Sequence, residues 1–415
     1  MSSPTPSTRS LRGLDWTNFF LSDVRTGVGP FVAVYLSNMH WNVAQIGVAL
    51  TVAEVAGLLT QAPGGAFMDY LRSKRGALVV AVLILSASAL LMALFPTLPI
   101  VFAAQAALGI TGSVFGPGIS AITLGLVGYS CLGQRTGRNA GFGSAGNVFA
   151  AVTMGIVGYL YSTRAIFFFV AVLAIPTVLS ILAIRGEEID YERARGREDA
   201  MPVSDEKVGF RAILSDRRML TLVVLTVFWH LGNGAMLAMI GEAMSRDRPQ
   251  QSSLWMSAAV TVPQIVMAAI APSVGRIADR HGRKRILLFG FLFLPLRTLL
   301  CAFTQAPAFL IGFQVFDGIS AGIFGIVGVL MVADLTRGTG HYNVALGTLG
   351  MAVGIGASIS TLMAGAVTQY MGFPAGFLTL SACSVMAVII LWLYMPETRV
   401  PEHDVPQGMK PQFQP

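Results

Sequence analysis

Charged side chains are scarce in this sequence of 415 residues. Asp, Glu, Lys and Arg together make up 12% of the chain, about half of their share in a soluble domain. Hydrophobic residues make up 54%. This composition excludes an ordinary soluble globular domain and indicates a membrane protein.

Cysteine is equally rare, and the sequence lacks several other signals. The three cysteines Cys131, Cys301 and Cys383 do not have the spacing of a disulfide framework or a zinc site. The polar first 15 residues are not followed by a short apolar core with a cleavage site, so we expect no secretory signal. No Gly-rich phosphate loop and no nucleophile–base pair is visible. We therefore expect no enzyme, no metal site and no cofactor, with a proton gradient as the energy source.

Long apolar stretches dominate what is present. A hydrocarbon core about 30 Å thick is crossed by roughly 20 apolar residues in a helix. We predict twelve transmembrane helices, with these bounds: 15–38, 45–67, 77–95, 99–127, 139–160, 165–184, 219–243, 253–274, 286–304, 307–333, 344–368 and 374–395.

The two halves of the chain resemble each other. Gly65, Asp69, Lys74 and Arg75 superimpose at a shift of 210 residues on Gly275, Asp279, Lys284 and Arg285. Gln105-x-x-x-Gly109 matches Gln314-x-x-x-Gly318, and Asn139 with Gly143 and Gly146 matches Asn343 with Gly347 and Gly350. Duplicated halves are common in membrane transporters, whose substrate sites lie between the repeats.

The duplication predicts the domain organisation. We expect an all-α membrane protein with two pseudo-symmetric six-helix bundles, residues 1–184 and 219–397. The linker 185–218 holds eight basic and nine acidic residues, so we expect it to be nearly neutral and well solvated. Residues 398–415 form a polar tail.

Basic residues predict the orientation. If the N-terminus is cytoplasmic, 23 of the 28 Lys and Arg residues lie on the inner side and only Arg164, Arg246 and Arg248 on the outer side. The positive-inside rule then places both termini in the cytoplasm. The anionic inner leaflet attracts these basic residues, so the net positive charge does not require nucleic acid. We expect a functional monomer in the inner (plasma) membrane of a bacterium, with the lipid bilayer and a small-molecule substrate as partners.

The loop sequence around Gly275 resembles the signature of the Major Facilitator Superfamily. That signature, G-x-x-x-D-R-x-G-R-K/R, is intact here as Gly275, Asp279, Arg280, Gly282, Arg283 and Lys284. The first copy keeps Gly65 and Asp69 but has Tyr70 and Arg72 at the next two signature positions. The resemblance implies secondary transport by rocking of two bundles around a central cavity.

The same motif residues are candidates for gating. Gly275 would let neighbouring helices approach, and Asp279 would accept hydrogen bonds from an arginine or a helix N-terminus. Such a patch would latch the cytoplasmic side, or the basic residues only enforce topology. The predicted gating loops comprise Gly65, Asp69, Lys74, Arg75, Gly275, Asp279, Arg280, Gly282, Arg283 and Lys284.

Two further motifs bear on the branch of the family. The proton-antiporter branch often has an arginine four residues before a glycine in the fourth span, where this sequence has Gln105. Its glycine-rich fifth-span signature appears only in part, as Gly155 and Gly158 without the proline. These motifs suggest efflux by proton exchange.

Ionisable residues inside membrane spans are costly and therefore candidates for function. Asp23 and Arg25 are two residues apart, so they point in different directions on one helix. We predict that Arg25 pairs with Glu54, which leaves Asp23 as the freer carboxylate and the proton or cation site. The alternative for Asp23 is a purely structural hydrogen bond.

The second half has its own charged pair, Arg297 and Asp317. It is either a buried salt bridge or an anion-binding arginine beside a titrating carboxylate. A shift of 210 residues places Asn233 opposite Asp23, with His230 one turn earlier. The predicted proton-coupling residues are Asp23, Glu54 and Asp317, and the predicted cavity residues are Arg25, Gln105, His230, Asn233 and Gln314.

Several functions fit this pattern. The leading hypothesis is a proton-coupled antiporter that exports a small organic molecule by alternating access. The alternatives are uptake symport of an organic anion bound by Arg25 or Arg297, and divalent transition-metal export with Asp23 and His230 as ligands. A membrane sensor on a transporter fold would normally carry an added soluble domain, which this sequence lacks.

Overall fold

A computed structural model describes residues 6–197, 210–247 and 252–399 of the chain. Within its helices, the side chains of residues 23–30, 34, 43–44, 210–212, 245–247 and 252–254 lie outside the description. The described chain is helical and contains no strand. Ten of its helices are long and apolar enough to cross a membrane.

The first half contains six long helices that coincide with the first six predicted spans. Their bounds are α1 (Thr8–Asn38), α2 (Val43–Tyr70), α3 (Lys74–Leu94), α4 (Leu98–Val127), α5 (Leu132–Leu160) and α6 (Thr163–Ala183). Polar residues begin several of them: the side chain of Asn42 accepts from the Gln45 backbone in a capping box, and Ser73 and Ser162 cap α3 and α6. Continuous apolar sequence then carries each helix to the other end.

The second half contains the other six predicted spans, two of them interrupted. The bounds are α7 (Phe210–Ser215), α8 (Arg217–Asn233), α9 (Met236–Asp247), α10 (Ser252–His281), α11 (Arg283–Ala302), α12 (Pro307–Gly312), α13 (Gln314–Leu335) and α14 (Tyr342–Tyr394). The seventh span comprises α8 and α9, and the tenth comprises α12 and α13. The last helix, α14, holds the eleventh and twelfth spans, which meet at Gly372, where φ is 86°. A side chain would be strained in that conformation, so glycine permits this abrupt turn.

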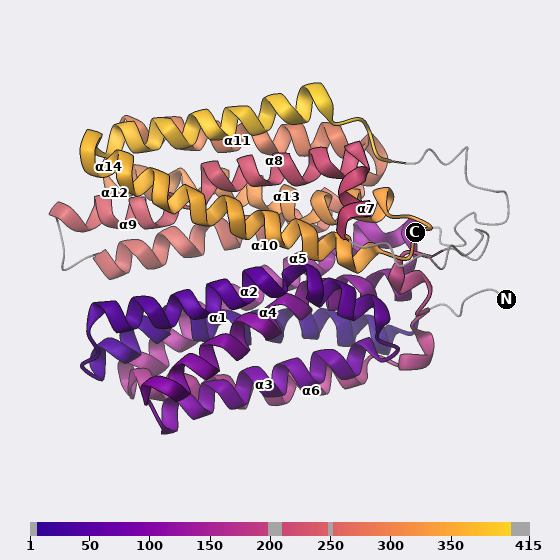
Figure 1. Ribbon diagram of the computed structural model, residues 1–415, viewed down its shortest axis with the longest axis horizontal. Coiled ribbons are helices and arrows are strands. Elements are labelled where there is room, and N and C mark those ends of the chain that lie inside the picture. The colour runs from indigo at the N-terminus through magenta and orange to yellow at the C-terminus, as the bar shows by residue number, and fades with distance from the viewer. Residues whose placement is uncertain (1–5, 198–209, 248–251, 400–415) are drawn as a thin grey trace.

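The helices form two bundles that lie side by side, the first half below and the second half above (Figure 1). One buried apolar cluster contains residues of the first half and the linker, and a second is made mainly by the second half. Each bundle therefore has a core of its own. The first residue of α1 and the last of α14 lie at the same end (Figure 1), which we call the terminal end, and the opposite end the far end.

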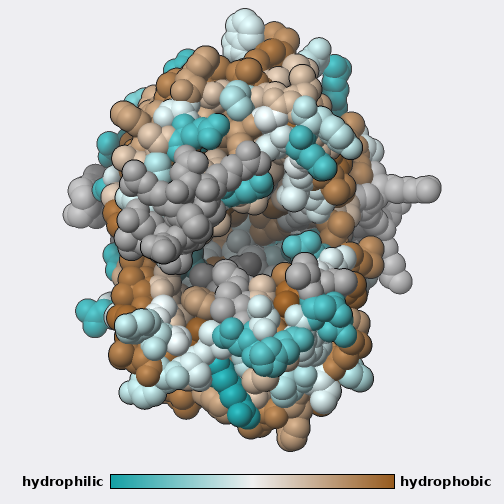
Figure 2. All heavy atoms as spheres, turned by 90° about the vertical axis from the view of Figure 1, so that its left-hand side faces the viewer, coloured by the Kyte–Doolittle hydropathy of each residue, from teal (hydrophilic) through white to brown (hydrophobic). Residues whose placement is uncertain are grey.

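The two halves meet along two seams, α2 with α14 and α5 with α10. Viewed from the far end, the surface is hollowed between the two halves (Figure 2). The twelve-helix, two-bundle architecture predicted from the sequence is confirmed.

The linker differs from its prediction. Ile189 and Ala194 are buried rather than solvated. The carbonyl of Ala194 accepts a hydrogen bond from Asn343 Nδ2 at 3.0 Å, and the carbonyl of Gly196 accepts one from the Gly338 backbone at 2.6 Å. The described part of the linker thus bonds to the start of α14, because charge composition does not reveal which backbone groups a loop offers.

Candidate transport pathway

The carboxylate of Asp69 joins the two halves at the terminal end. Asp69 is the penultimate residue of α2, and its Oδ1 accepts from the Asn343 backbone at 3.3 Å and from Asn343 Nδ2 at 2.7 Å. Its Oδ2 accepts from the Val344 backbone at 3.0 Å. These N–H groups belong to the first turn of α14, where unpaired donors and the helix dipole favour a negative charge. Asp69 therefore caps a helix of the opposite half.

Asp279 does the same for the other seam. The backbone N–H of Gln134, in the first turn of α5, donates to this carboxylate. Arg283 binds Asp279 at 2.6 Å and Asp334 at 3.1 Å, which ties the cap to the rest of the second half. The predicted acceptor role of Asp279 is confirmed with both kinds of donor, an arginine and a helix N-terminus.

Two glycines allow the seams to close. A Cβ atom on Gly65 would lie 2.1 Å from the carbonyl oxygen of Asn343, and one on Gly275 would lie 1.9 Å from that of Gly133. No side chain fits at these distances. The prediction that Gly275 permits close helix approach is confirmed.

We expect Gly275→Ala to prevent full closure of the α5–α10 seam. The added methyl group must push α10 from α5, and overpacking of this kind costs about 1–3 kcal/mol. Transport by the variant should fall at least tenfold. Gly155→Ala is the matched control, since nothing lies within 4 Å of a Cβ at that helical position. Equal transport by the two variants would contradict the prediction.

The seams correct one part of the predicted repeat. Gly133 and Asn343 occupy equivalent places beside Gly275 and Gly65, and Gly137 packs on Ala271 as Gly347 packs on Gln61. All of these pairs differ by 210 residues, so Asn343 corresponds to Gly133 and not to Asn139. The match of Asn139, Gly143 and Gly146 with Asn343, Gly347 and Gly350 was wrong. The similar tetrapeptides lie at different depths, one inside α5 and the other at the start of α14.

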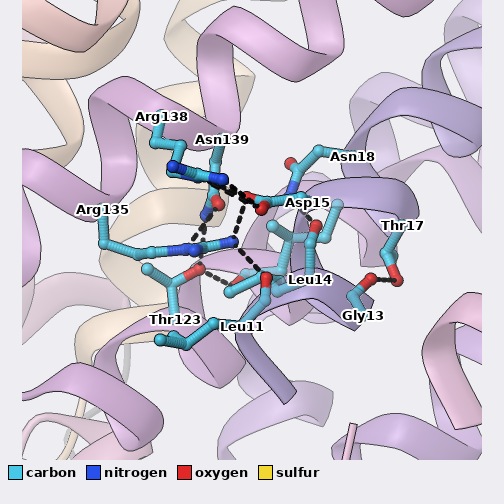
Figure 3. A network of polar contacts seen from close by, with 11 residues as sticks. Leu11, Gly13, Leu14, Asp15, Thr17, Asn18, Thr123, Arg135, Arg138 and Asn139 are labelled. Atoms are coloured by element: carbon cyan, nitrogen blue, oxygen red, sulfur yellow. Dashed lines mark hydrogen bonds and ion pairs between the residues drawn. The ribbon is translucent and has the colours of Figure 1, made fainter. Parts of the chain in front are cut away.

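A charged cluster inside the first half was missed from the sequence. Asp15 of α1 binds Arg135 at 2.7 Å and Arg138 at 2.8 Å (Figure 3). Arg135 also donates to Asn139 at 3.0 Å, and Asn139 donates to Thr123 at 2.8 Å. The signal was present, because residues 135, 138 and 139 share one face of a helix. This cluster joins α1, α4 and α5 at the terminal end.

The other predicted gating residues form contacts within their own half. The ammonium of Lys74, which is fully buried, donates to the Met68 carbonyl. Arg75 donates to the Leu182 carbonyl at 3.1 Å, and Lys284 to that of Trp392 at 2.9 Å. Arg280 is exposed.

The start of α11 is capped by Glu397, which follows α14. Gly282 has a φ of 95° and turns the chain into α11. The carboxylate of Glu397 accepts from the backbone N–H groups of Arg283 at 2.7 Å and Lys284 at 3.2 Å. The second signature loop is therefore held by the segment after the last helix, a contact that sequence spacing did not indicate.

Arg297 is the centre of a polar network in the second half. It is 2% exposed, and its guanidinium donates to Asp317 at 2.6 Å, to Asn233 at 2.7 Å and to Gln314 at 2.7 Å. The side chain of Asp317 is 19% exposed. The structure thus brings together four of the residues selected from the sequence, and Asn233 bonds to Arg297 rather than standing alone.

Aromatic residues flank this network. The Nδ1 atom of His230 lies 2.9 Å from the Thr226 carbonyl, which makes Nδ1 the protonated nitrogen and Nε2 an acceptor. Its ring packs edge-on against Trp229 and Phe324. Gln105, its first-half counterpart in the predicted cavity set, is buried with 2% exposure.

Glu54 is the described first-half carboxylate among the predicted proton-coupling residues. It is exposed in the middle of α2. Asp23 and Arg25 fall on side chains outside the description, so the predicted Arg25–Glu54 pair stays a prediction. Among the described residues, no group of three or more His, Cys, Asp and Glu side chains is placed to hold a metal ion.

Two repeated six-helix bundles, closed at one end and hollowed at the other, define a secondary transporter. The chain belongs to the Major Facilitator Superfamily, whose profile it matches over residues 16–246 and 230–414. It is an integral membrane protein.

Known proteins agree with this assignment. An uncharacterized MFS-type transporter of Mycobacterium tuberculosis is 37% identical over 392 residues, which cover 94% of each chain. A multi-drug resistance efflux pump PmrA homolog of Lactococcus lactis is 25% identical over 36% of each chain. The crystal structure of the human organic anion transporter MFSD10 superimposes with a TM-score of 0.72 at 17% identity, covering 94% of this chain and all of the other.

Proposed function

We propose that this protein exports a small organic molecule in exchange for protons by alternating access. The observation that carries the proposal is the hollow between the halves, open at the far end while Asp69 and Asp279 cap the opposite half at the terminal end. The density of basic residues supports a cytoplasmic terminal end, in the plasma membrane of a bacterium. In that orientation the structure is the outward-open state of the cycle.

Proton coupling requires a carboxylate that meets both the hollow and the seams. Glu54 is exposed on α2, and Asp317 is partly exposed beside Arg297. Asp23 is the third candidate, since its position in the first span places it at a similar depth. A carboxylate that alternates between an open hollow and a dry seam changes its proton affinity with the state of the transporter, which is the requirement for exchange.

Proton-gradient dissipation in everted membrane vesicles tests this function. We expect one class of compound among cationic, neutral and anionic organic molecules and divalent metals to dissipate the gradient. Asp23→Asn should reduce the response at least tenfold if Asp23 takes part. Vesicles without the protein give the baseline. No response to any class, with the wild-type protein verified in the membrane, would overturn the proposal of proton-coupled export.

A second candidate function is uptake of an organic anion together with a proton. Arg297 favours it, because its Nε atom is buried and has no hydrogen-bond partner among the described residues. A protonated Asp317 would leave the guanidinium free for a carboxylate or phosphate. Accumulation of an anionic compound in right-side-out vesicles under an inward proton gradient, lost in Arg297→Gln, would establish this alternative instead.

A further inference from the structure

The two seams follow one register until they reach the middle of the membrane. Gly275 contacts Gly133 as Gly65 contacts Asn343, and Ala271 contacts Gly137 as Gln61 contacts Gly347. Continuing at the same shift of 210 residues, Gln264 of α10 corresponds to Glu54 of α2. Its neighbour across the seam, Asn147 of α5, corresponds to Ala357 of α14.

The α5–α10 seam is joined at this position by two neutral amides. The Nδ2 of Asn147 donates to the Oε1 of Gln264 at 3.1 Å. A neutral hydrogen-bonded pair can be enclosed between packed helices at little cost, because neither side chain carries a charge and each finds a partner.

The α2–α14 seam has a carboxylate and a methyl group at the same position. Glu54 lies four and seven residues before Leu58 and Gln61, so it shares their face of the helix. Leu58 packs on Gly354 and Gln61 on Gly350, one and two turns closer to the terminal end. Glu54 is exposed and forms no hydrogen bond or ion pair with the described residues, and Ala357 offers no polar group to it.

We propose that the outer part of the α2–α14 seam closes only when Glu54 is neutralised, either by a proton or by the cationic group of a substrate. Closing this seam around an ionised carboxylate would bury a charge without a partner, which is strongly unfavourable. A proton makes Glu54 an uncharged group like Gln264, and a cation gives it a partner. The inference rests on the proposed function and specifies its substrate class as organic cations.

The surroundings of Glu54 contain few other ionisable groups. The packed helix α4 has none, and residues 342–371 of α14 contain only Tyr342 and Tyr370, at the two ends of that segment. The third neighbour, α1, contributes Asp23 and Arg25 at a comparable depth, whose side chains lie outside the description. These two residues are therefore included in the test.

Distance measurements across the seam provide the test. Spin labels at Thr51 and Thr361, both exposed on the far-end parts of α2 and α14, report closure in purified protein in nanodiscs between pH 5 and pH 9. In wild-type protein the ratio of closed to open molecules should rise on acidification by up to about tenfold per pH unit, the limit for one coupled proton. Glu54→Gln should be mostly closed at every pH.

Two probes of matched shape and opposite charge test the substrate class. At pH 8, tetraphenylphosphonium should increase the closed population of the wild type severalfold, and tetraphenylborate should not. The double variant Glu54→Gln, Ala357→Asn recreates the amide pair of the other seam and should be the most closed of all. Asp23→Asn and Arg25→Gln should keep the pH-dependent closure.

Three results would overturn the inference: unchanged pH dependence in Glu54→Gln, loss of the pH dependence in Asp23→Asn or Arg25→Gln alone, or equal closure by the two probes. The outcome is separable from the proposed function. A pH-dependent seam in a protein that dissipates no proton gradient would refute proton-coupled export and leave the role of Glu54 standing. Proton exchange with a Glu54-independent seam would do the reverse.

Discussion

Replacing Asp317 with asparagine is expected to destabilise the second half by about 3–5 kcal/mol, the cost of breaking a buried ion pair by removing one partner. Arg297 is 2% exposed, so its charge would remain enclosed with only neutral acceptors around it. The apparent melting temperature of the detergent-purified protein measures the effect.

Two comparison variants separate charge from hydrogen bonding. Gln314→Met removes one neutral acceptor of Arg297 and leaves the ion pair, so it should cost about 1–2 kcal/mol. The double variant Arg297→Met, Asp317→Leu removes both charges and should recover most of the stability lost in Asp317→Asn. If the double variant melted no higher than the single one, the pair would not be the source of the stability.

Transport by the double variant distinguishes the two interpretations of the pair. Full activity would indicate that Arg297 and Asp317 only join packed helices. Loss of activity in a stable double variant would place the pair in the pathway of the substrate or the proton.

The second large effect is expected from Asp69→Asn combined with Asp279→Asn. Each carboxylate caps a helix of the opposite half, and hydrogen bonds to a charged group contribute about 1.5–3 kcal/mol. Their joint loss should shift the equilibrium toward a state open at the terminal end by about a hundredfold or more. Labelling of a single cysteine at the fully buried Ala345, in a chain without Cys131, Cys301 and Cys383, measures that opening.

Asp15→Asn is the matched control for the two caps. Asp15 is also a buried carboxylate at the terminal end, but its partners Arg135 and Arg138 belong to the same half. Its loss should weaken the first bundle without increasing the labelling rate at Ala345. Equal labelling in this control and the double variant would mean that general loosening, and not the caps, exposes the seam.

Sequence reasoning predicted the helices and the seam residues because both depend on local properties. Long apolar runs require helices in a bilayer, and a glycine five residues before the end of a span marks a close approach whatever the partner is. The cap residues Asp69 and Asp279 were therefore recognised from the motif alone.

Partners across helices were harder to predict. The rotation of each helix decides which side chains meet, and the sequence does not contain that rotation. Asn233 was set opposite Asp23 by the repeat, yet it accepts a hydrogen bond from Arg297. Asp15 escaped notice because its arginine partners lie about 120 residues away, and Ala194 because it contributes only a backbone carbonyl.

Gly372 links the gating seam to the surrounding lipid. Because a single residue of non-helical conformation separates the two parts of α14, no loop absorbs a change in their relative tilt, and the eleventh and twelfth spans move as one rigid hairpin. The first arm forms a seam with α2, and the second arm exposes apolar side chains such as Leu378 and Trp392. Opening of the seam must therefore tilt a bilayer-facing helix, which makes membrane thickness a mechanical load on the transport cycle.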